Sequence, residues 1–393
     1  MKSVPGNSID LLRSVSRSLY LSIRFLPARL RDPIGLAYLL ARATDTIADT
    51  AQVPVQLRIK KLRTLADAIQ SRSQPNELCS LRDSFTPLQT NEAERTLIEV
   101  LPACLDWLDR LEEEERHDVR NVLAKINRGQ LLDVQRFGDA TEVRALATAA
   151  ELDEYTYLVA GCVGEFWTQI CARHLRNFAA RGAEQMRNLG REYGKGLQLI
   201  NILRDAGSDL RSGRCYLPEE ELIAGGVAPN EILNEPARAQ PVFEKWRRKA
   251  ENAMVAGLEY ACVINLSRVR FATALPALIG VRTLALLREA GPQALQRNVK
   301  IPRNEVRAIV SRVAITLASL ARCEKYSRSF REKKTLRKIS ALLFCDRSPE
   351  AVEHLQHVFP NFSFFRGRLI AEQVRGMIRD HERSIFVDVP SAA

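Results

Sequence analysis

The stretch QLINILRDAGSDLRSGRCYLP, residues 198–218, carries the clearest chemical pattern in the chain. Within it, Asn201, Asp205 and Asp209 recur every fourth residue, so a helix places their three oxygen-bearing side chains on one face. Such a row is costly to bury among apolar neighbours unless a cation neutralises it. Mg²⁺ prefers oxygen ligands and commonly bridges carboxylates to phosphates. The stretch therefore predicts a helix end that binds Mg²⁺ and a diphosphate; the alternative is a structural polar helix end leading into a Gly/Pro loop from Gly207 to Pro218.

Two arginines and a second acidic pair support the diphosphate interpretation. Arg204 and Arg214 offer fork-shaped guanidinium donors that match phosphate oxygens. Earlier in the chain, RATDTIAD (residues 42–49) places Asp45 and Asp49 on one face near the end of a strongly helical segment. Their mutual repulsion favours a bound divalent cation, although a solvated helix face is the alternative. The chain between the two clusters is long enough for several helices, so a bundle can place the acidic faces opposite each other across a cavity.

The chain up to about residue 340 is predicted to be helical. Apolar residues recur at helical spacing, for example Leu36, Leu39, Leu40, Ala43 and Ile47. Alternating β-branched runs between tight turns, which are typical of sheets, are nearly absent. Breakers such as Asp32-Pro33 and Gly291-Pro292 are expected to divide the helices. We therefore expect an all-α fold whose helices form one domain.

Composition narrows the class of protein. Of the 393 residues, 46% are hydrophobic and 27% charged, which is ordinary for a globular protein and excludes a disordered or collagen-like chain. The net charge of +11 suits an anionic partner, but no basic and aromatic interleaving predicts nucleic-acid binding, so we expect no nucleic-acid partner. We see neither an uncharged run of roughly 18–20 residues nor a secretory signal, and expect a cytoplasmic protein. The eight cysteines lack the spacing of a disulfide framework or zinc site.

Facing acidic helices with nearby arginines suit one type of reaction, the ionisation of an allylic diphosphate. Breaking the carbon–oxygen bond requires metal ions and arginines that stabilise the leaving diphosphate. It also requires an apolar wall that holds the carbocation away from water. Nucleophilic side chains are unnecessary for this chemistry.

Together these motifs resemble the squalene and phytoene synthase family of head-to-head prenyl transferases over roughly residues 10–310, with a bacterial-type squalene synthase as the most similar member. Further stretches match that family in order: SRS at 16–18, YTYLVAGCVGE at 155–165, Gln198 ahead of Asn201, and NVKIP at 298–302. The resemblance implies a single isoprenoid-synthase-type helical bundle around a deep apolar pocket, with the acidic motifs at its mouth. It makes residues 1–310 the catalytic domain, 311–340 a helical extension and 341–393 an accessory C-terminal tail of unknown role.

The resemblance also implies roles for single residues. The Mg²⁺ ligands would be Asp45, Asp49, Asn201, Asp205 and Asp209, and the four aspartates would be catalytic. Tyr155 would be catalytic as well, because it matches the tyrosine that steers the carbocation or its proton. Substrate binding would involve Ser16, Arg17, Ser18, Arg42, Tyr157, Gln198, Asn201, Arg204 and Arg214. Gly161 and Gly164 are expected to let two helices approach closely.

The product within this family depends on how the reaction ends. Members first join two farnesyl or geranylgeranyl diphosphates into a cyclopropyl diphosphate. Squalene synthases then add hydride from NADPH, whereas phytoene and dehydrosqualene synthases lose a proton. RATDTIAD resembles the squalene-synthase form, while GRCYLP (213–218) and VAGCVGE (159–165) resemble the carotenoid and bacterial form. We favour squalene made from two farnesyl diphosphates, with Mg²⁺ and NADPH as cofactors, although no G-x-G-x-x-G fingerprint is present.

Two further interpretations concern partners other than prenyl diphosphates. A non-catalytic homologue would use the tail after residue 340 to bind a partner, but such a subunit has little reason to keep four apposed carboxylates. The basic run Arg331–Lys338 is usually a solvated face, yet it also suits peripheral association with a membrane surface, since prenyl diphosphates combine apolar tails with anionic heads. The sequence leaves the oligomeric state open.

Overall fold

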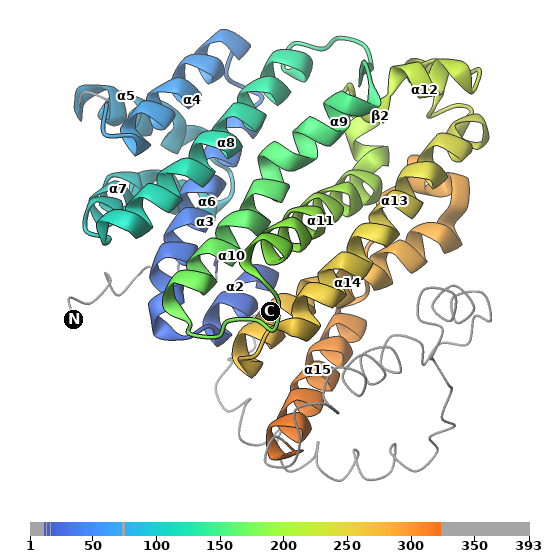
Figure 1. The fold of residues 1–393 in the computed structure, drawn as a ribbon. Helices are drawn as coiled ribbons and strands as arrows, with labels where there is room; N and C mark the ends of the chain where they lie inside the picture. The colour runs from blue at the N-terminus through green and yellow to red at the C-terminus, as the bar shows by residue number, and fades with distance from the viewer. Residues whose placement is uncertain (1–11, 13, 16, 73–74, 324–393) are drawn as a thin grey trace, which may run out of the picture. The chain divides into compact units, whose positions relative to one another are not determined.

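The computed structural model describes residues 12, 14–15, 17–72 and 75–323, and of residues 17–19, 21, 75 and 314–323 the backbone alone. This part of the chain is almost entirely helical, which confirms the predicted all-α class (Figure 1). The α-helices are α2 (Arg17–Phe25), α3 (Ala28–Asp49), α4 (Val55–Ile69), α5 (Pro75–Phe85), α6 (Glu92–Glu99), α7 (Leu101–Asp109), α8 (Glu113–Phe137), α9 (Ala149–Thr156), α10 (Cys162–His174), α11 (Ala183–Arg211), α12 (Glu219–Ala224), α13 (Pro236–Val263), α14 (Ser267–Ala290) and α15 (Arg303–Cys323). Shorter helical elements are η1 (Thr86–Leu88), η2 (Tyr157–Gly161, a π-helix), η3 (Pro229–Glu231) and η4 (Gly291–Leu295).

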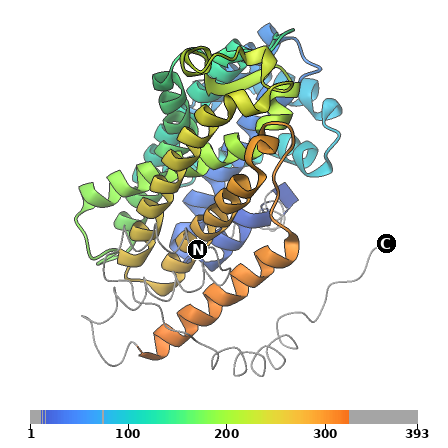
Figure 2. The same ribbon diagram turned by 90° about the vertical axis from the view of Figure 1, so that its right-hand side faces the viewer.

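The long helices pack side by side. Figure 1 shows α8, α10, α11 and α13 in succession, and each contacts the next. Helix α3 packs against α8 and α10, while α14 packs against α11 and α13. Figure 2 shows α13 and α14 running along each other, with α15 beside α14. This arrangement sets α3 and α11, the helices of the two acidic motifs, within one bundle.

Helix α3 shows why this sequence buries one face and exposes another. The five apolar positions predicted to share a face are all fully buried: Leu36, Leu39, Leu40, Ala43 and Ile47. Burying a large aliphatic side chain contributes roughly 1.5–3 kcal/mol to folding, so this stripe fixes the rotation of the helix. Asp45 and Asp49 fall outside the stripe; Asp45 is partly buried and Asp49 is exposed. The hydrophobic pattern therefore aims the first acidic motif away from the core.

Glycines allow α10 and α11 to touch backbone to backbone. A Cβ atom at Gly190 would lie 2.7 Å from the carbonyl oxygen of Gly164, and one at Gly164 would overlap the carbonyl oxygen of Gly190. A Cβ atom at Gly161 would lie 2.9 Å from Cγ of Lys195. The close approach predicted from Gly161 and Gly164 is thus confirmed. It holds the segment that carries Tyr155 against the helix of the second acidic motif.

Two local predictions were wrong. The loop predicted from Gly207 does not start there, because α11 continues to Arg211. Gly207 lies inside the helix and instead allows a close contact, since a Cβ atom there would lie 2.6 Å from the backbone nitrogen of Arg297. Residues Arg214–Pro218 then form strand β2, which pairs in parallel with β1 (Arg144–Leu146). The predicted breaker Asp32-Pro33 lies inside α3, where the proline removes one backbone hydrogen bond and the helix continues past it.

The later part of the chain was predicted only in outline. The stretch Ser267–Leu295 is long and apolar enough to cross a membrane, but 67% of its most apolar window is buried. It packs against α2, α11, α13 and α15, which is the behaviour of a core helix. Helix α15 runs across the expected boundary at residue 310 without a break. The expected tail 341–393 and the run Arg331–Lys338 lie outside the described residues.

Candidate active site

Arg214, the first residue of β2, links the end of the first acidic motif to the segment that follows the second. Its Nη1 atom lies 3.6 Å from Oδ1 of Asp49 and 3.6 Å from Oδ2 of Asp133. Asp49 is the last residue of α3, and β2 follows α11, which carries Asp205 and Asp209 near its end. The packing therefore brings the end of α3 and the end of α11 together, as the sequence predicted.

The carboxylates of this cluster repel one another across the two helices. Desolvation raises the pKa of Asp45 to about 7, and the charges of Asp49 and Asp133 add to the rise. Desolvation also raises the pKa of Asp209 to about 7, with further contributions from Asp205, Asp133 and Asp49. Because Asp49 and Asp133 act on both groups, the carboxylates share one electrostatic environment. Negative charge concentrated in this way favours the binding of a divalent cation.

The donor set fits Mg²⁺ that is shared with a phosphate ligand. In the part of the chain that the structure describes, no three His, Cys, Asp or Glu side chains converge closely enough to hold a metal by themselves. Proteins usually bind Mg²⁺ through one or two carboxylates together with waters and substrate phosphates, because the ion gives up its waters reluctantly. The pairs Asp45/Asp49 and Asp205/Asp209 suit that mode of binding. Mg²⁺ would then complete its coordination with a diphosphate.

The three predicted phosphate-binding arginines all lie against carboxylates. Arg204 Nη2 is 2.5 Å from Oδ2 of Asp205, and Arg42 Nη2 is 2.5 Å from Oε1 of Glu94. The Nε atom of Arg42 is buried without a hydrogen-bond partner, so this guanidinium retains a free donor. Together with Arg214, these groups place positive charge beside the acidic cluster. A diphosphate can displace the carboxylates from these guanidinium groups, because charge-assisted hydrogen bonds to phosphate are strong.

Tyr155 belongs to a buried group behind the acidic motifs. Its ring stacks on that of Tyr216, with ring centroids 5.1 Å apart and planes inclined by 20°. The Tyr216 hydroxyl donates a hydrogen bond to Oδ1 of Asp133 at 2.6 Å. Desolvation raises the pKa of Tyr155 well above its ordinary value, so its phenol stays neutral. A neutral aromatic face attracts cations, which suits the steering role predicted for Tyr155.

Sequence analysis missed Gln130, Asp133 and Tyr216. Gln130 Nε2 donates a hydrogen bond to Oδ1 of Asp45 at 2.5 Å, and the side chain of Asp133 is only 7% exposed. A usable signal lies in GQLLDVQRF (residues 129–137), where one carboxylate falls within an apolar helical run. Burying such a group is costly unless charged or hydrogen-bonding partners serve it. Tyr216 lies within residues 198–218, two residues after Arg214.

Other predicted residues lie at the edge of the cluster or outside the description. Asn201 is exposed, and its Nδ2 atom donates to Oε1 of Gln198 at 3.3 Å, one turn earlier on α11. Ser16 is not among the described residues. Arg17 and Ser18 begin α2, but their side chains are not described. Their predicted contacts with substrate stay predictions.

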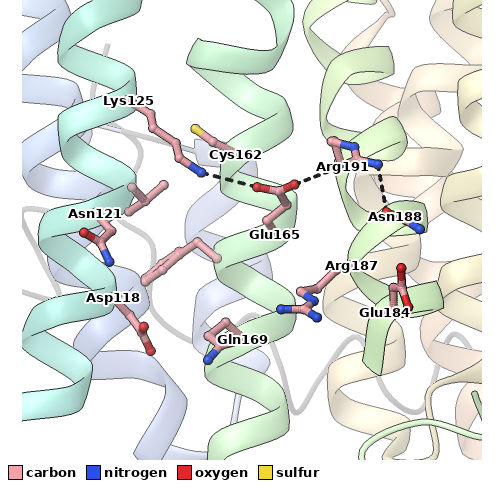
Figure 3. Close-up of a pocket in the computed structure, with 12 residues that line it drawn as sticks. Asp118, Asn121, Lys125, Cys162, Glu165, Gln169, Glu184, Arg187, Asn188 and Arg191 are labelled. Carbon is pink, nitrogen blue, oxygen red and sulfur yellow. Dashed lines mark hydrogen bonds and ion pairs between the residues drawn. The ribbon is translucent and has the colours of Figure 1, made fainter. Parts of the chain in front are cut away.

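Tyr157 lies apart from the acidic motifs. Its hydroxyl accepts a hydrogen bond from Lys125 Nζ at 2.9 Å and donates one to Oε2 of Glu165 at 3.1 Å. Figure 3 shows Glu165 of α10 between Lys125 of α8 and Arg191 of α11, in a groove of about 530 Å³. No predicted metal ligand lines this groove. The structure thus places Tyr157 with the groove network rather than with the predicted substrate site.

The NVKIP stretch at 298–302 supports the second acidic motif from behind. The backbone nitrogen of Val299 donates to the carbonyl oxygen of Arg204 at 3.2 Å. Arg211 Nη1 donates to the carbonyl oxygen of Gln296 at 2.6 Å. These contacts hold the end of α11 in place. They explain why a sequence match so far along the chain belongs to the same site.

The raised carboxylate pKa values predict that the metal-free protein loses stability as pH rises. An Asp with an ordinary pKa of 3.8 that rises to about 7 on folding is neutral in both states below about pH 4. Above that pH the unfolded chain releases the proton first, so the free energy of unfolding falls until pH passes about 7. We expect the Tm measured with chelator to be lower at about pH 8 than at about pH 5, and Mg²⁺ to reduce the difference. If the Asp45→Asn/Asp209→Asn double variant showed the same difference in Tm between the two pH values as the wild type, these two carboxylates would not be its cause.

Asp133→Asn is expected to slow product formation by about 100-fold. The amide keeps an acceptor for the Tyr216 hydroxyl but loses the charge that holds Arg214, so the guanidinium is no longer fixed beside Asp49. Steady-state rates at saturating substrate and Mg²⁺ measure the effect. Asp139→Asn is a matched control, because Asp139 is exposed and bonds only Arg144 among the described residues. Wild-type turnover by Asp133→Asn would show that Arg214 needs no support from this carboxylate.

Comparison with known proteins places these features in a family. The model of the squalene/phytoene synthase family matches residues 12–305. The squalene synthase of Candida albicans is 24% identical over 368 residues, which cover 91% of this chain and 78% of that protein. The squalene synthase of Saccharomyces cerevisiae is 27% identical over 299 residues, which cover 74% of this chain and 63% of that protein.

Solved structures share the fold. A complex of TcSQS with a ligand superposes with a TM-score of 0.66 at 20% identity, covering 88% of this chain and 95% of that one. A dehydrosqualene synthase superposes with a TM-score of 0.54 at 22% identity, covering 79% of this chain and 95% of that one. Fold and site together define an all-helical prenyl transferase of the isoprenoid-synthase type. The chain belongs to the squalene/phytoene synthase family.

Proposed function

We propose that this prenyl transferase joins two farnesyl diphosphates head to head, through a cyclopropyl diphosphate, to give squalene, with Mg²⁺ at the acidic motifs and NADPH as the reductant. The observation that carries the proposal is that Arg214 lies against Asp49 of the first acidic motif, while the charge of Asp49 also acts on Asp209 of the second. The similarity to the squalene synthases of Candida albicans and Saccharomyces cerevisiae supports squalene as the product. Peripheral membrane association and a cytoplasmic location are part of the same proposal.

The residues of the cluster divide the work of ionising a diphosphate. Mg²⁺, when bound, supplies positive charge that stabilises the leaving diphosphate. Asp49 and Asp209, at the ends of α3 and α11, would be among the residues that hold the ion. The guanidinium of Arg214 stays aimed into the site because Asp133 fixes it from behind. Because these charges are positioned before substrate arrives, little reorganisation is needed when the carbon–oxygen bond breaks.

Buried aromatic side chains serve the carbocation rather than the diphosphate. Tyr155 and Tyr216 are 6% and 8% exposed, so their stacked rings present an apolar, water-poor surface beside the charged cluster. The Tyr216 hydroxyl is occupied by Asp133 and is therefore not free to attack a carbocation. Excluding water and nucleophiles in this way protects the intermediate from hydrolysis.

The reductive ending rests on similarity rather than on a site. Within the described residues the sheet consists of the two short strands β1 and β2, and neither is followed by a G-x-G-x-x-G fingerprint. No described cluster of side chains marks a nicotinamide site, so we assign no residue to NADPH and derive no step from it. Product analysis therefore decides between reduction and proton loss.

Purified protein incubated with farnesyl diphosphate and Mg²⁺, with and without NADPH, provides that analysis. We expect mass spectrometry of the extracted hydrocarbons to show squalene only when NADPH is present. Dehydrosqualene formed regardless of NADPH would replace the reductive ending with proton loss. If neither farnesyl nor geranylgeranyl diphosphate gives a hydrocarbon, the proposed reaction is wrong.

A further inference from the structure

One end of the bundle lies far from the acidic cluster. Helix α3 begins there at Ala28 and reaches Asp45 only near its other end, so about 25 Å of helix separates the two. Helix α11 likewise begins at Ala183 and carries Asp205 and Asp209 only near its last turns. The distant end is formed by the α2–α3 corner, the α13–α14 corner and the segment between α10 and α11. We call these residues, 24–29, 175–182 and 264–268, the distal end.

Hydrogen bonds join the three segments of the distal end into one surface. Arg268 Nε donates to the carbonyl oxygen of Phe25 at 2.9 Å, which ties the α13–α14 corner to the α2–α3 corner. The backbone nitrogen of Asn265 donates to the carbonyl oxygen of Phe178 at 2.9 Å, which ties it to the segment after α10. The ring of Phe25 packs on that of Phe271 with centroids 4.4 Å apart. The segments are therefore held in a fixed arrangement.

The distal end exposes apolar and cationic side chains together. Phe25 is 39% exposed and Leu266 is 38% exposed, on either side of the Arg268 contact. The exposed arginines of this surface are Arg24, Arg29, Arg176, Arg181 and Arg268. Of these, Arg24, Arg29 and Arg176 have no acidic partner among the described residues, and Arg181 pairs with Glu259. Single exposed apolar side chains are ordinary, but apolar side chains set among unpaired arginines mark an interaction surface.

We propose that the distal end makes the peripheral membrane contact of the proposed function, on which this inference rests, by binding the surface of an anionic lipid bilayer. Arg24, Arg29 and Arg176 would contact lipid phosphates, while Phe25 and Leu266 would enter the boundary between headgroups and acyl chains. Charge complementarity identifies this partner, since the negative surface potential of an anionic bilayer attracts arginines close to it. The exposed apolar side chains favour a bilayer over a nucleic acid, whose backbone offers them no apolar environment. Docking by this end leaves the acidic cluster facing water, whichever hydrocarbon the enzyme makes.

Vesicle sedimentation of the full chain tests the proposal. We expect binding to vesicles of phosphatidylcholine with phosphatidylserine, and little binding to phosphatidylcholine alone. The Arg24→Glu/Arg29→Glu variant is expected to bind at least about 30-fold more weakly, because two arginine contacts are lost. The Phe25→Ser/Leu266→Ser variant, which has the same net charge as the wild type, is expected to bind these vesicles more weakly than the wild type. Turnover of soluble substrate without vesicles is expected to stay near wild type in both, because neither pair belongs to the acidic cluster.

A matched control separates this surface from net charge. Arg63→Glu/Arg110→Glu makes the same change in charge at exposed arginines of α4 and the end of α7, which have no acidic partner among the described residues. We expect it to bind vesicles like the wild type. Equal loss in both double charge variants, or no loss in Arg24→Glu/Arg29→Glu, would overturn the proposal in favour of net charge or another segment. A distal variant that retains vesicle binding but loses self-association, or binding to duplex nucleic acid, would assign this end to that partner instead.

Discussion

Asp209→Asn is expected to lower the rate of product formation by at least about 1000-fold. Asp209 lies near the end of α11, where desolvation, together with the charges of Asp205, Asp133 and Asp49, raises its pKa to about 7, so it belongs to the negative charge that Mg²⁺ would neutralise. The amide is nearly the same size but offers no charge to the metal. Without the ion, the leaving diphosphate loses its main stabilisation. Steady-state assays over a wide range of Mg²⁺ concentrations measure the loss.

The stability of the same variant separates a functional role from a structural one. Removing a carboxylate that is repelled by its neighbours relieves strain, so the Tm of Asp209→Asn at about pH 8 should be no lower than that of the wild type. Asp106→Asn, at an exposed position of α7 with no ion pair among the described residues, is the matched control and should keep full activity. A large fall in Tm accompanying the lost activity would argue for a structural role.

Gly164→Ala is expected to have the largest effect on stability. Its Cβ atom would overlap the carbonyl oxygen of Gly190, so α10 and α11 must move apart to accept it. Alanine favours helix by about 1 kcal/mol over glycine, but overpacking two backbones costs about 3 kcal/mol or more. Separation also shifts Tyr155 away from the end of α11. We expect a Tm lower by about 5 °C and reduced activity, measured by thermal circular dichroism and product assay.

Gly182→Ala provides the comparison for that result. Gly182 is the residue before α11, and a Cβ atom there has no neighbour within 4 Å. Its replacement costs at most about 1 kcal/mol, through the weaker capping by alanine. If Gly164→Ala and Gly182→Ala were equally stable, the contact between the backbones of α10 and α11 would not be as tight as the structure shows.

The helical class and the shared face of each pair of aspartates were predictable because they depend on local spacing. Apolar residues on one stripe of α3 fix its buried face, and this aims Asp45 and Asp49 together. The four-residue spacing of Asp205 and Asp209 needs only a continuous helix, which α11 provides. Both features are properties of a single helix. Only their encounter depends on the bundle.

The residues that sequence reasoning missed depend on contacts between distant segments. Asp133 is one acidic residue of α8, and only the folded chain places it between Arg214 and Tyr216. Tyr157 shows the opposite case, because its position two residues after Tyr155 suggested a shared site. The π-helical turn η2 begins at Tyr157. The hydroxyl of Tyr157 accepts a hydrogen bond from Lys125 instead of lying with Tyr155. Helical spacing could not reveal that local change.

Release of inorganic diphosphate from farnesyl diphosphate tests the central claim most directly, because it reports ionisation regardless of how the product is quenched. We predict no release by the full chain after thorough chelation, saturable release as Mg²⁺ is added back, and release by Asp209→Asn at least about 1000-fold slower. Diphosphate release that continues undiminished after chelation, or at the wild-type rate in Asp209→Asn, would contradict a metal-dependent site at the facing ends of α3 and α11.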